Sequence, residues 1–157
     1  MDKTRWLNQK ETDTWLALWA VSSWMPTRLD EQLKADNEMN LHDYFTLAQV
    51  SLADDGRLSM TELACRTQMS PSRLSHVVGR LEKRGLVERN PDEQDRRTNI
   101  ASVTPEGWDF LDNAAPGHVE RVREIVFDPL TKEEAEQFGV LLQKILKKLD
   151  PPALPRA

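Results

Sequence analysis

The sequence predicts a mostly helical α+β protein, and three features of its 157 residues support that fold class. Helix-start patterns recur along the chain, each with Ser, Thr or Asn ahead of an apolar stretch. Within these stretches the apolar residues return every three or four positions, as on one face of a helix. Two short strand-like segments flank a polar turn at residues 91–97, which predicts one hairpin.

The first predicted helix runs from about Glu11 to Met25 and is apolar nearly all round. Such a helix is expected to be covered on two sides, by its own core and by something else. Pro26 is expected to kink or restart it, and the second stretch ends at about Lys34. Asn40 is the predicted N-cap of a helix over 41–52, which the Asp-Asp-Gly turn at 54–56 follows.

Residues 59–107 carry the pattern of a winged helix-turn-helix. Ser59 with Glu62 predicts a reciprocal capping box. Ser70 before a proline predicts the N-cap of a second helix, which ends before Gly85. The segments 86–90 and 98–103 form a predicted hairpin with a charged tip. Two helices joined by a tight turn and followed by a basic hairpin can present one helix to a DNA groove and a loop to the next.

Two further helices are predicted beyond the hairpin. Thr104 begins one that reaches about Phe127 and is bent by Pro116 and Gly117. A capping box at 131–134 opens the last helix, which ends at about residue 149, and the tail over 150–157 is predicted to be disordered. The apolar positions of the last helix recur at helical spacing: Phe138, Leu141, Leu142, Ile145 and Leu149.

No repeat, low-complexity tract or linker divides the chain, so residues 1–157 are expected to pack as a single domain. Helices from both ends carry more apolar surface than one small domain needs to bury. We therefore expect residues 1–36 and 108–149 to form a dimerisation lobe that joins two copies of a DNA-binding lobe at 40–107. A monomer with a generous core is the alternative.

The charge distribution agrees with nucleic-acid binding, although the net charge of −5 alone argues against it. Residues 57–104 hold nine Lys/Arg and six Asp/Glu, a net charge of +3, whereas the rest of the chain carries −8. A locally basic unit inside an acidic protein is the electrostatic footprint of such binding.

Other function classes lack support in the sequence. No apolar run approaches the roughly 18 residues of a membrane span, and the first residues show no signal-peptide pattern. One cysteine permits no internal disulfide, so a cytoplasmic location without a membrane partner is expected. There is no Ser-His-Asp set, phosphate loop or metal-ligand spacing among His42, His76 and His118, so we expect no enzyme activity, cofactor or metal.

The chain from about Trp15 to Leu149 resembles the MarR family of bacterial transcription regulators. The most specific likenesses are the segment 80–89 (RLEKRGLVER) and Asp95-Arg96-Arg97, followed by Val103-Thr104 and a glycine at 107. The resemblance implies homodimers of winged-helix protomers joined through their terminal helices. The chain departs from the family at two positions. At His76 the family most often has Arg, so the bases that are read could differ. At Val103 the family usually has Leu.

The residues themselves indicate which surface reads DNA. In the helix from Pro71 to Arg84, Leu74, Val77, Val78 and Leu81 are spaced to point inward, and the opposite face carries hydroxyl, imidazole and guanidinium donors. The candidate DNA-binding residues on this helix and the hairpin are Ser70, Ser72, Arg73, Ser75, His76, Arg80, Lys83, Arg89, Asp95, Arg96 and Arg97.

Each hairpin residue has an expected role. Arg97 suits insertion into a narrow minor groove, and Arg89 and Arg96 suit phosphate contacts. By resemblance to the family, Asp95 orients an arginine rather than touching DNA. Gly79, in mid-helix, fits either close approach of a DNA backbone or a tight packing contact. A solvated polar helix face and an ordinary charged turn are the plainer interpretations.

The resemblance also implies an effector pocket between the dimer helices and the DNA-binding lobe. Its candidate residues, which a plain core explains equally, are Trp15, Trp19, Trp24, Tyr44, Phe45 and His118. Cys65 is a candidate redox site, since helix periodicity places it on an outer face beside Arg66. Redox-sensing members of the family usually carry their reactive cysteine in the first helix, so Cys65 departs from that pattern.

The sequence therefore predicts a sequence-specific regulator of transcription that binds double-stranded DNA. It is expected to act as a repressor on a palindromic operator, to work as a homodimer, and to be released by a small lipophilic or aromatic effector. The alternatives are a redox-sensing repressor switched by oxidation of Cys65 and a winged-helix module that binds proteins.

Overall fold

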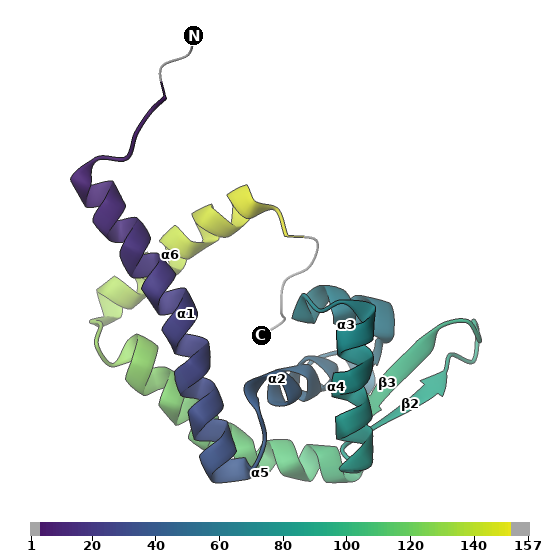
Figure 1. Cartoon of the computed structure of the whole chain (residues 1–157). Helices are drawn as coiled ribbons and strands as arrows, with labels where there is room; N and C mark the ends of the chain where they lie inside the picture. The colour runs from purple at the N-terminus through teal and green to yellow at the C-terminus, as the bar shows by residue number, and fades with distance from the viewer. Residues whose placement is uncertain (1–3, 152–157) are drawn as a thin grey trace.

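The structure is a computed structural model that describes residues 4–151 (Figure 1). The predicted disorder at 152–157 therefore lies outside the described residues. Seven helical and three strand elements follow one another, with a π-helical segment after the fifth α-helix. They are α1 (Gln9–Asn37), α2 (Leu41–Ser51), η1 (Asp54–Gly56), β1 (Arg57–Ser59), α3 (Met60–Thr67), α4 (Pro71–Lys83), β2 (Val87–Pro91), β3 (Asn99–Val103), α5 (Pro105–Val122), η2 (Arg123–Phe127) and α6 (Lys132–Leu149).

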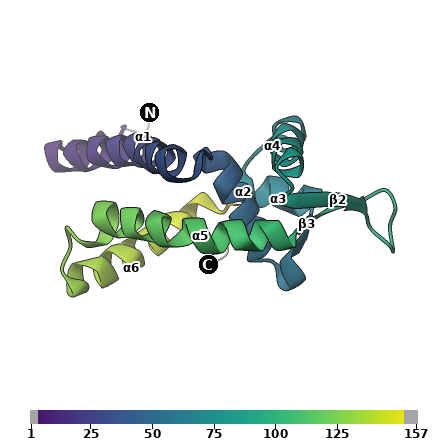
Figure 2. The same ribbon diagram turned by 90° about the horizontal axis from the view of Figure 1, so that it is seen from below.

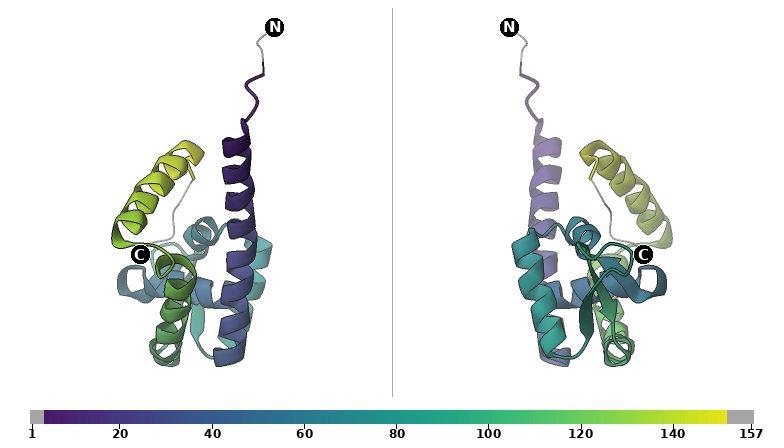
Figure 3. Two further views of the ribbon diagram at one scale, coloured as in Figure 1. Left: turned by 90° about the vertical axis from the view of Figure 1, so that its left-hand side faces the viewer. Right: turned by 90° about the vertical axis from the view of Figure 1, so that its right-hand side faces the viewer.

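The elements from α2 to β3 form a compact unit, which we call the central lobe. Its antiparallel sheet has the order β1-β3-β2, with Leu58 opposite Ala101 and Val87 opposite Val103. The hairpin of β2 and β3, which we call the wing, projects from one end of the lobe, while α1, α5 and α6 extend from the other (Figure 2). In Figure 3, α1 and α6 are seen as two separate arms, with the yellow end of α6 leaning toward α1.

The core fills the central lobe and extends to α1 and α5 where they pack on it. Leu33 of α1, Leu47 of α2 and Ala114 of α5 are buried there. In α4 the four residues predicted to point inward are all buried: Leu74, Val77, Val78 and Leu81. The exposed polar face of α4 is therefore held in place by the apolar packing of the opposite face.

Local capping chemistry places most helix starts as predicted. Asn40, Ser70 and Thr104 each accept a hydrogen bond from the backbone N–H three residues on, and residue 131 forms a reciprocal capping box. The reciprocal box predicted at Ser59 is only half formed. Ser59 accepts from the N–H of Glu62, but the Glu62 carboxylate binds Arg66 instead of returning to the cap.

Two further predictions about the elements are corrected, and one strand was missed. The expected restart at Pro26 is wrong, since α1 continues from residue 9 to 37 with the proline inside it. Loss of one backbone N–H is tolerated because the turns on both sides remain bonded. Strand β1 was not predicted, because three residues are too short to show alternation. The end of the α5 helix is a π-helical segment at 123–127 rather than regular α-helix.

Much apolar surface of the terminal helices is uncovered within the described chain. Along α6 none of the residues is buried, although the helix is strongly amphipathic. Trp15 and Trp19 of α1 are 50% and 62% exposed, and Leu141 and Ile145 of α6 are 48% and 46% exposed. Apolar surface on this scale marks an interaction face.

Candidate nucleic-acid interface

Helix α4 presents a polar face to solvent. It starts at Ser70, whose hydroxyl accepts from the backbone N–H of Arg73 at 3.3 Å. The predicted contact residues on its outward side are all exposed: Ser70, Ser72, Arg73, Ser75, His76, Arg80 and Lys83. These side chains offer the donors that read base edges and phosphates in a major groove.

The tip of the wing is organised by two aspartates. Asp95 accepts from the backbone N–H of Arg97 at 3.1 Å and from the Thr98 hydroxyl at 3.2 Å. Asp92 accepts from the N–H of Gln94 at 2.7 Å. These contacts of Asp95 shape the turn itself, and the expectation that Asp95 orients an arginine side chain stays a prediction. The contacts leave the side chains of Arg96 and Arg97 exposed.

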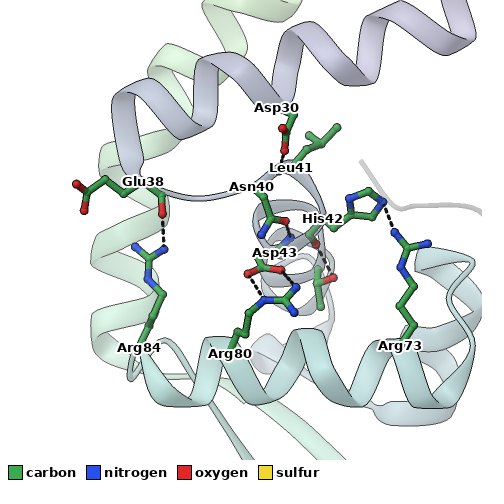
Figure 4. A network of polar contacts seen from close by, with 10 residues as sticks. Asp30, Glu38, Asn40, Leu41, His42, Asp43, Arg73, Arg80 and Arg84 are labelled. Carbon is green, nitrogen blue, oxygen red and sulfur yellow. Dashed lines mark hydrogen bonds and ion pairs between the residues drawn. The ribbon is translucent and has the colours of Figure 1, made fainter.

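Two predicted contact residues are engaged inside the protein. Arg80 donates to both carboxylate oxygens of Asp43 on α2, at 2.6 and 3.0 Å, as Figure 4 shows. Asp43 is 4% exposed, whereas the Arg80 side chain is 50% exposed. The hydrogen bonds to Asp43 raise the pKa of the Arg80 guanidinium, an effect that partial burial opposes.

Arg89 of β2 is similarly tied to the recognition helix. Its guanidinium donates to the Ser75 hydroxyl and to the Glu82 carboxylate, both at 3.2 Å. These contacts brace the wing against α4. The predicted phosphate role of Arg89 therefore competes with an internal one.

A row of contacts joins α4 to the start of α2 and the end of α1 (Figure 4). Arg73 lies 2.8 Å from His42 Nε2, and Arg84 donates to the carbonyl of Glu38 at 3.0 Å. Asp30 of α1 accepts from the backbone N–H of Leu41 at 2.9 Å. Although burial opposes it, hydrogen bonds from Lys34 and Leu41 lower the pKa of Asp30.

The sequence analysis did not include the residues at the start of α2 among the candidate DNA-binding residues. Asn40 was identified only as a cap, and His42 and Asp43 carry no local signal of a partner more than 30 residues away. The structure gathers them with α4 around a concavity of about 440 Å³. It is lined by Asn40 and His42 together with Ser70, Ser72, Arg73, His76 and Arg80.

Gly79 lies on this side of the molecule with open space around it. A Cβ built on it meets no heavy atom within 4 Å, outside its own helix backbone. A tight packing contact within the described chain therefore does not account for the glycine. Close approach of a DNA backbone stays a prediction.

The six aromatic and histidine candidates for an effector pocket do not gather in one place. Tyr44 and His118 stack at 4.6 Å between ring centroids, and Trp15 and Trp19 form a separate pair at 5.9 Å on exposed surface. Trp24 lies under the guanidinium of a neighbouring arginine on α1. Phe45, on α2, is half-buried.

The Tyr44–His118 pair lies in a partly buried, low-polarity environment. Burial lowers the pKa of His118 and raises the pKa of Tyr44, so both groups are held neutral. His118 Nδ1 and Gln32 Oε1 are buried without a hydrogen-bond partner among the described residues. The amide of Gln32 lies beside Gly117, the neighbour of His118, where α1 packs on α5.

Cys65 is exposed on α3, as predicted. It borders a hollow of about 760 Å³ whose lining is mostly apolar and includes Met69 of the central lobe and Leu149 of α6. Arg66 does not flank the thiol on the surface, because its side chain is buried and paired with Glu62. The electrostatic argument for a reactive thiol is corrected accordingly.

No group of three His, Cys, Asp or Glu that could hold a metal ion occurs within residues 4–151. Over the same range, no helix combines the length and apolar character needed to cross a membrane.

An exposed recognition helix followed by a braced two-stranded wing defines a winged helix-turn-helix protein. The model of the MarR family matches residues 38–98, and the chain belongs to that family. The relatives reported below are named as transcription regulators and not as enzymes, as the sequence analysis predicted.

Three of these relatives define the match. The chain is 38% identical to Sco3205 of Streptomyces coelicolor, a MarR family transcriptional regulator solved in complex with DNA; the match covers 99% of this chain and 98% of that one, with a TM-score of 0.88. It is 30% identical to the HTH-type transcriptional regulator PapX of Escherichia coli over 66% of this chain and 62% of PapX. It is 26% identical to the transcriptional repressor MprA of E. coli strain K12 over 77% of this chain and 68% of MprA.

Proposed function

We propose that this protein is a sequence-specific regulator of transcription that binds double-stranded DNA and acts as a repressor. The observation that carries the proposal is the exposed donor face of α4 beside a wing whose tip presents Arg96 and Arg97. The face suits the major groove, and the wing suits the adjacent minor groove. Sco3205, solved in complex with DNA, and MprA, named as a repressor, support the same function.

The protein works as a homodimer in this proposal, with residues 40–107 on DNA and residues 1–36 and 108–149 joining the two copies. The uncovered apolar faces of α1 and α6 support it, because a second copy can bury them by two-fold symmetry. Two recognition helices related in this way enter successive major grooves about 34–36 Å apart, so a palindromic operator follows.

The decisive experiment selects duplexes from a random DNA pool with the purified protein and sequences what binds. An inverted repeat with half-site centres about 10 base pairs apart supports the proposal, and steep weakening of binding with salt is expected because several Lys and Arg side chains meet phosphates. Enrichment of no sequence, or a monomer in sedimentation at micromolar concentration, contradicts it. A dimer that enriches no duplex would favour the protein-interaction module.

Release by a small aromatic or lipophilic effector is part of the proposed function. The support is the junction of α1, α2 and α5, where the Tyr44–His118 stack includes a buried His118 Nδ1 without a hydrogen-bond partner among the described residues. A ligand with an aromatic ring and a polar group can satisfy both features. It acts only if it binds the state that cannot bind DNA more tightly than the competent one.

Oxidation of Cys65 is the rival means of release, supported by the exposure of the thiol. Peroxide treatment of the protein–DNA complex, with Cys65→Ser as the control, separates the two. If peroxide reversibly releases wild type from DNA but does not release Cys65→Ser, redox sensing is supported. If both proteins stay bound to DNA, release by oxidation is excluded and release by a ligand is the remaining mechanism.

A further inference from the structure

Part of the lining of the concavity between α2 and α4 lies outside both the recognition helix and the wing. Two of its lining residues, Asn40 and His42, belong to the start of α2. The others come from α4 and its N-cap Ser70 and include the guanidinium groups of Arg73 and Arg80. Basic and amide groups from two separate elements thus converge on one hollow of about 440 Å³.

The donors of this hollow are oriented by their own hydrogen bonds. Asn40 uses its side-chain oxygen to accept the N–H of Asp43 at 2.9 Å, which turns its amide NH₂ group away from the helix. Arg73 lies on the α4 side of the same hollow, 2.8 Å from His42. The NH₂ group and the guanidinium are the donors that phosphate oxygens accept from.

The carboxylates near this point are already neutralised. Asp43 is bound by Arg80 through two hydrogen bonds, and Asp30 is bound by Lys34 and by the backbone N–H of Leu41. Because Arg80 is paired with Asp43, the unpaired positive charge among the lining residues is that of Arg73. A hollow with this net charge attracts anionic groups such as phosphate.

From these observations we propose that Asn40 and His42 form, with Arg73, a separate phosphate contact that holds the DNA backbone beside the groove occupied by α4. This inference rests on the proposed function and names a contact on α2, outside the recognition helix and the wing. Phosphate contacts of this kind fix the register of a protein on a duplex without reading bases. The contact therefore contributes equally on all sequences.

The test is Asn40→Asp, because Asp caps a helix as well as Asn but puts a negative charge at the concavity. The matched control is Asn8→Asp, the same substitution at the N-cap of α1, far along the arm from the central lobe. Both variants change the net charge equally. A second variant, His42→Glu, places a carboxylate in the same hollow at an exposed position that caps nothing.

Affinity is measured on the selected duplex and on an unrelated duplex, between 50 and 200 mM salt, with thermal melts to compare folding. We expect Asn40→Asp and His42→Glu to weaken binding about five- to tenfold on both duplexes at low salt, with the difference shrinking as salt rises. Asn8→Asp, at an exposed position and with its oligomeric state checked by sedimentation against wild type, is expected to match wild type. If Asn40→Asp and His42→Glu bind like Asn8→Asp, the inference is wrong while the proposed function stands.

Two further outcomes are separable. If wild type binds no duplex, the proposed function itself fails, and this contact with it. Inorganic phosphate, titrated at constant ionic strength, identifies the source of the anion. Saturable binding of free phosphate that Asn40→Asp removes, with DNA affinity unchanged, would overturn the assignment to the DNA backbone.

Discussion

The ion pair between Arg80 and Asp43 is expected to respond unequally to removal of its two partners. Asp43 is 4% exposed and receives two hydrogen bonds from a guanidinium whose own side chain is 50% exposed. Without Asp43, Arg80 can turn to water. Without Arg80, the carboxylate of Asp43 stays buried beside α4 with its main charge partner gone.

The magnitudes follow from this asymmetry. Arg80→Ala leaves an uncompensated buried charge, and we expect it to lower the free energy of unfolding by about 3 kcal/mol. Asp43→Asn loses charge-assisted bonds to a half-exposed partner that water can screen, so its cost is about 1 kcal/mol. The double variant removes the charge and the partner together and is expected to cost less than the two single losses added. At about 2–4 °C per kcal/mol for a chain of this size, Arg80→Ala lowers the melting temperature by roughly 6–12 °C.

Urea denaturation of the four proteins at one protein concentration provides the double-mutant cycle. The concentration is held constant because self-association shifts apparent stability. Equal losses from the two single variants, or strict additivity in the double variant, would refute the reasoning from burial.

The remaining predictions concern two glycines, the wing and the buried histidine. Gly107→Ala is expected to prevent stable folding, seen as loss of a cooperative melt, because its Cβ would lie 2.1 Å from the Leu86 carbonyl oxygen. Gly79→Ala should raise stability by about 0.5–1 kcal/mol in denaturation, since nothing contacts its Cβ, yet weaken DNA binding; unchanged binding would end the DNA explanation for the glycine. Arg97→Ala should weaken binding on selected duplexes while its melting temperature stays that of wild type, and an unaltered affinity would exclude the minor-groove role. Burial lowers the pKa of His118 below its ordinary value of 6.5 in the folded chain. The stability contributed by the neutral histidine is therefore fully present above pH 6.5 and is lost as the pH falls below it. Denaturation at pH 7.5 and 5.5 should show that the free energy of unfolding falls less in His118→Phe than in wild type.

The sequence predicted what local chemistry decides. The caps at Asn40, Ser70 and Thr104 were found because an N-cap side chain and its partner lie three residues apart. The inward face of α4 was found because helical periodicity needs no knowledge of the partner. The fold class could be predicted because it depends on such local signals, in which the interacting residues lie only a few positions apart.

Contacts between distant segments were not predictable in this way. Arg80 and Arg89 looked like free donors on a polar face, yet the structure pairs them with Asp43 and Glu82. Asp43 stands 37 residues from Arg80, and no spacing rule connects them. Arg66 was expected to place its guanidinium beside the exposed Cys65 thiol, but its side chain is buried and paired with Glu62. In each case a charged side chain was given a role before its internal partner was known.

These internal pairings connect helix α4 to helix α1 by hydrogen bonds. Arg84 at the end of α4 holds the carbonyl of Glu38, the residue that ends α1 in a left-handed conformation with φ at 51°. Asp30 of α1 holds the start of α2, and Asp43 of α2 holds Arg80. A shift of α1 against α5 therefore reaches α4 through hydrogen bonds as well as packing. In the proposed homodimer, an effector bound beside His118 would have to alter this joint, because only an unequal affinity for two positions of α4 could change the spacing of the two recognition helices.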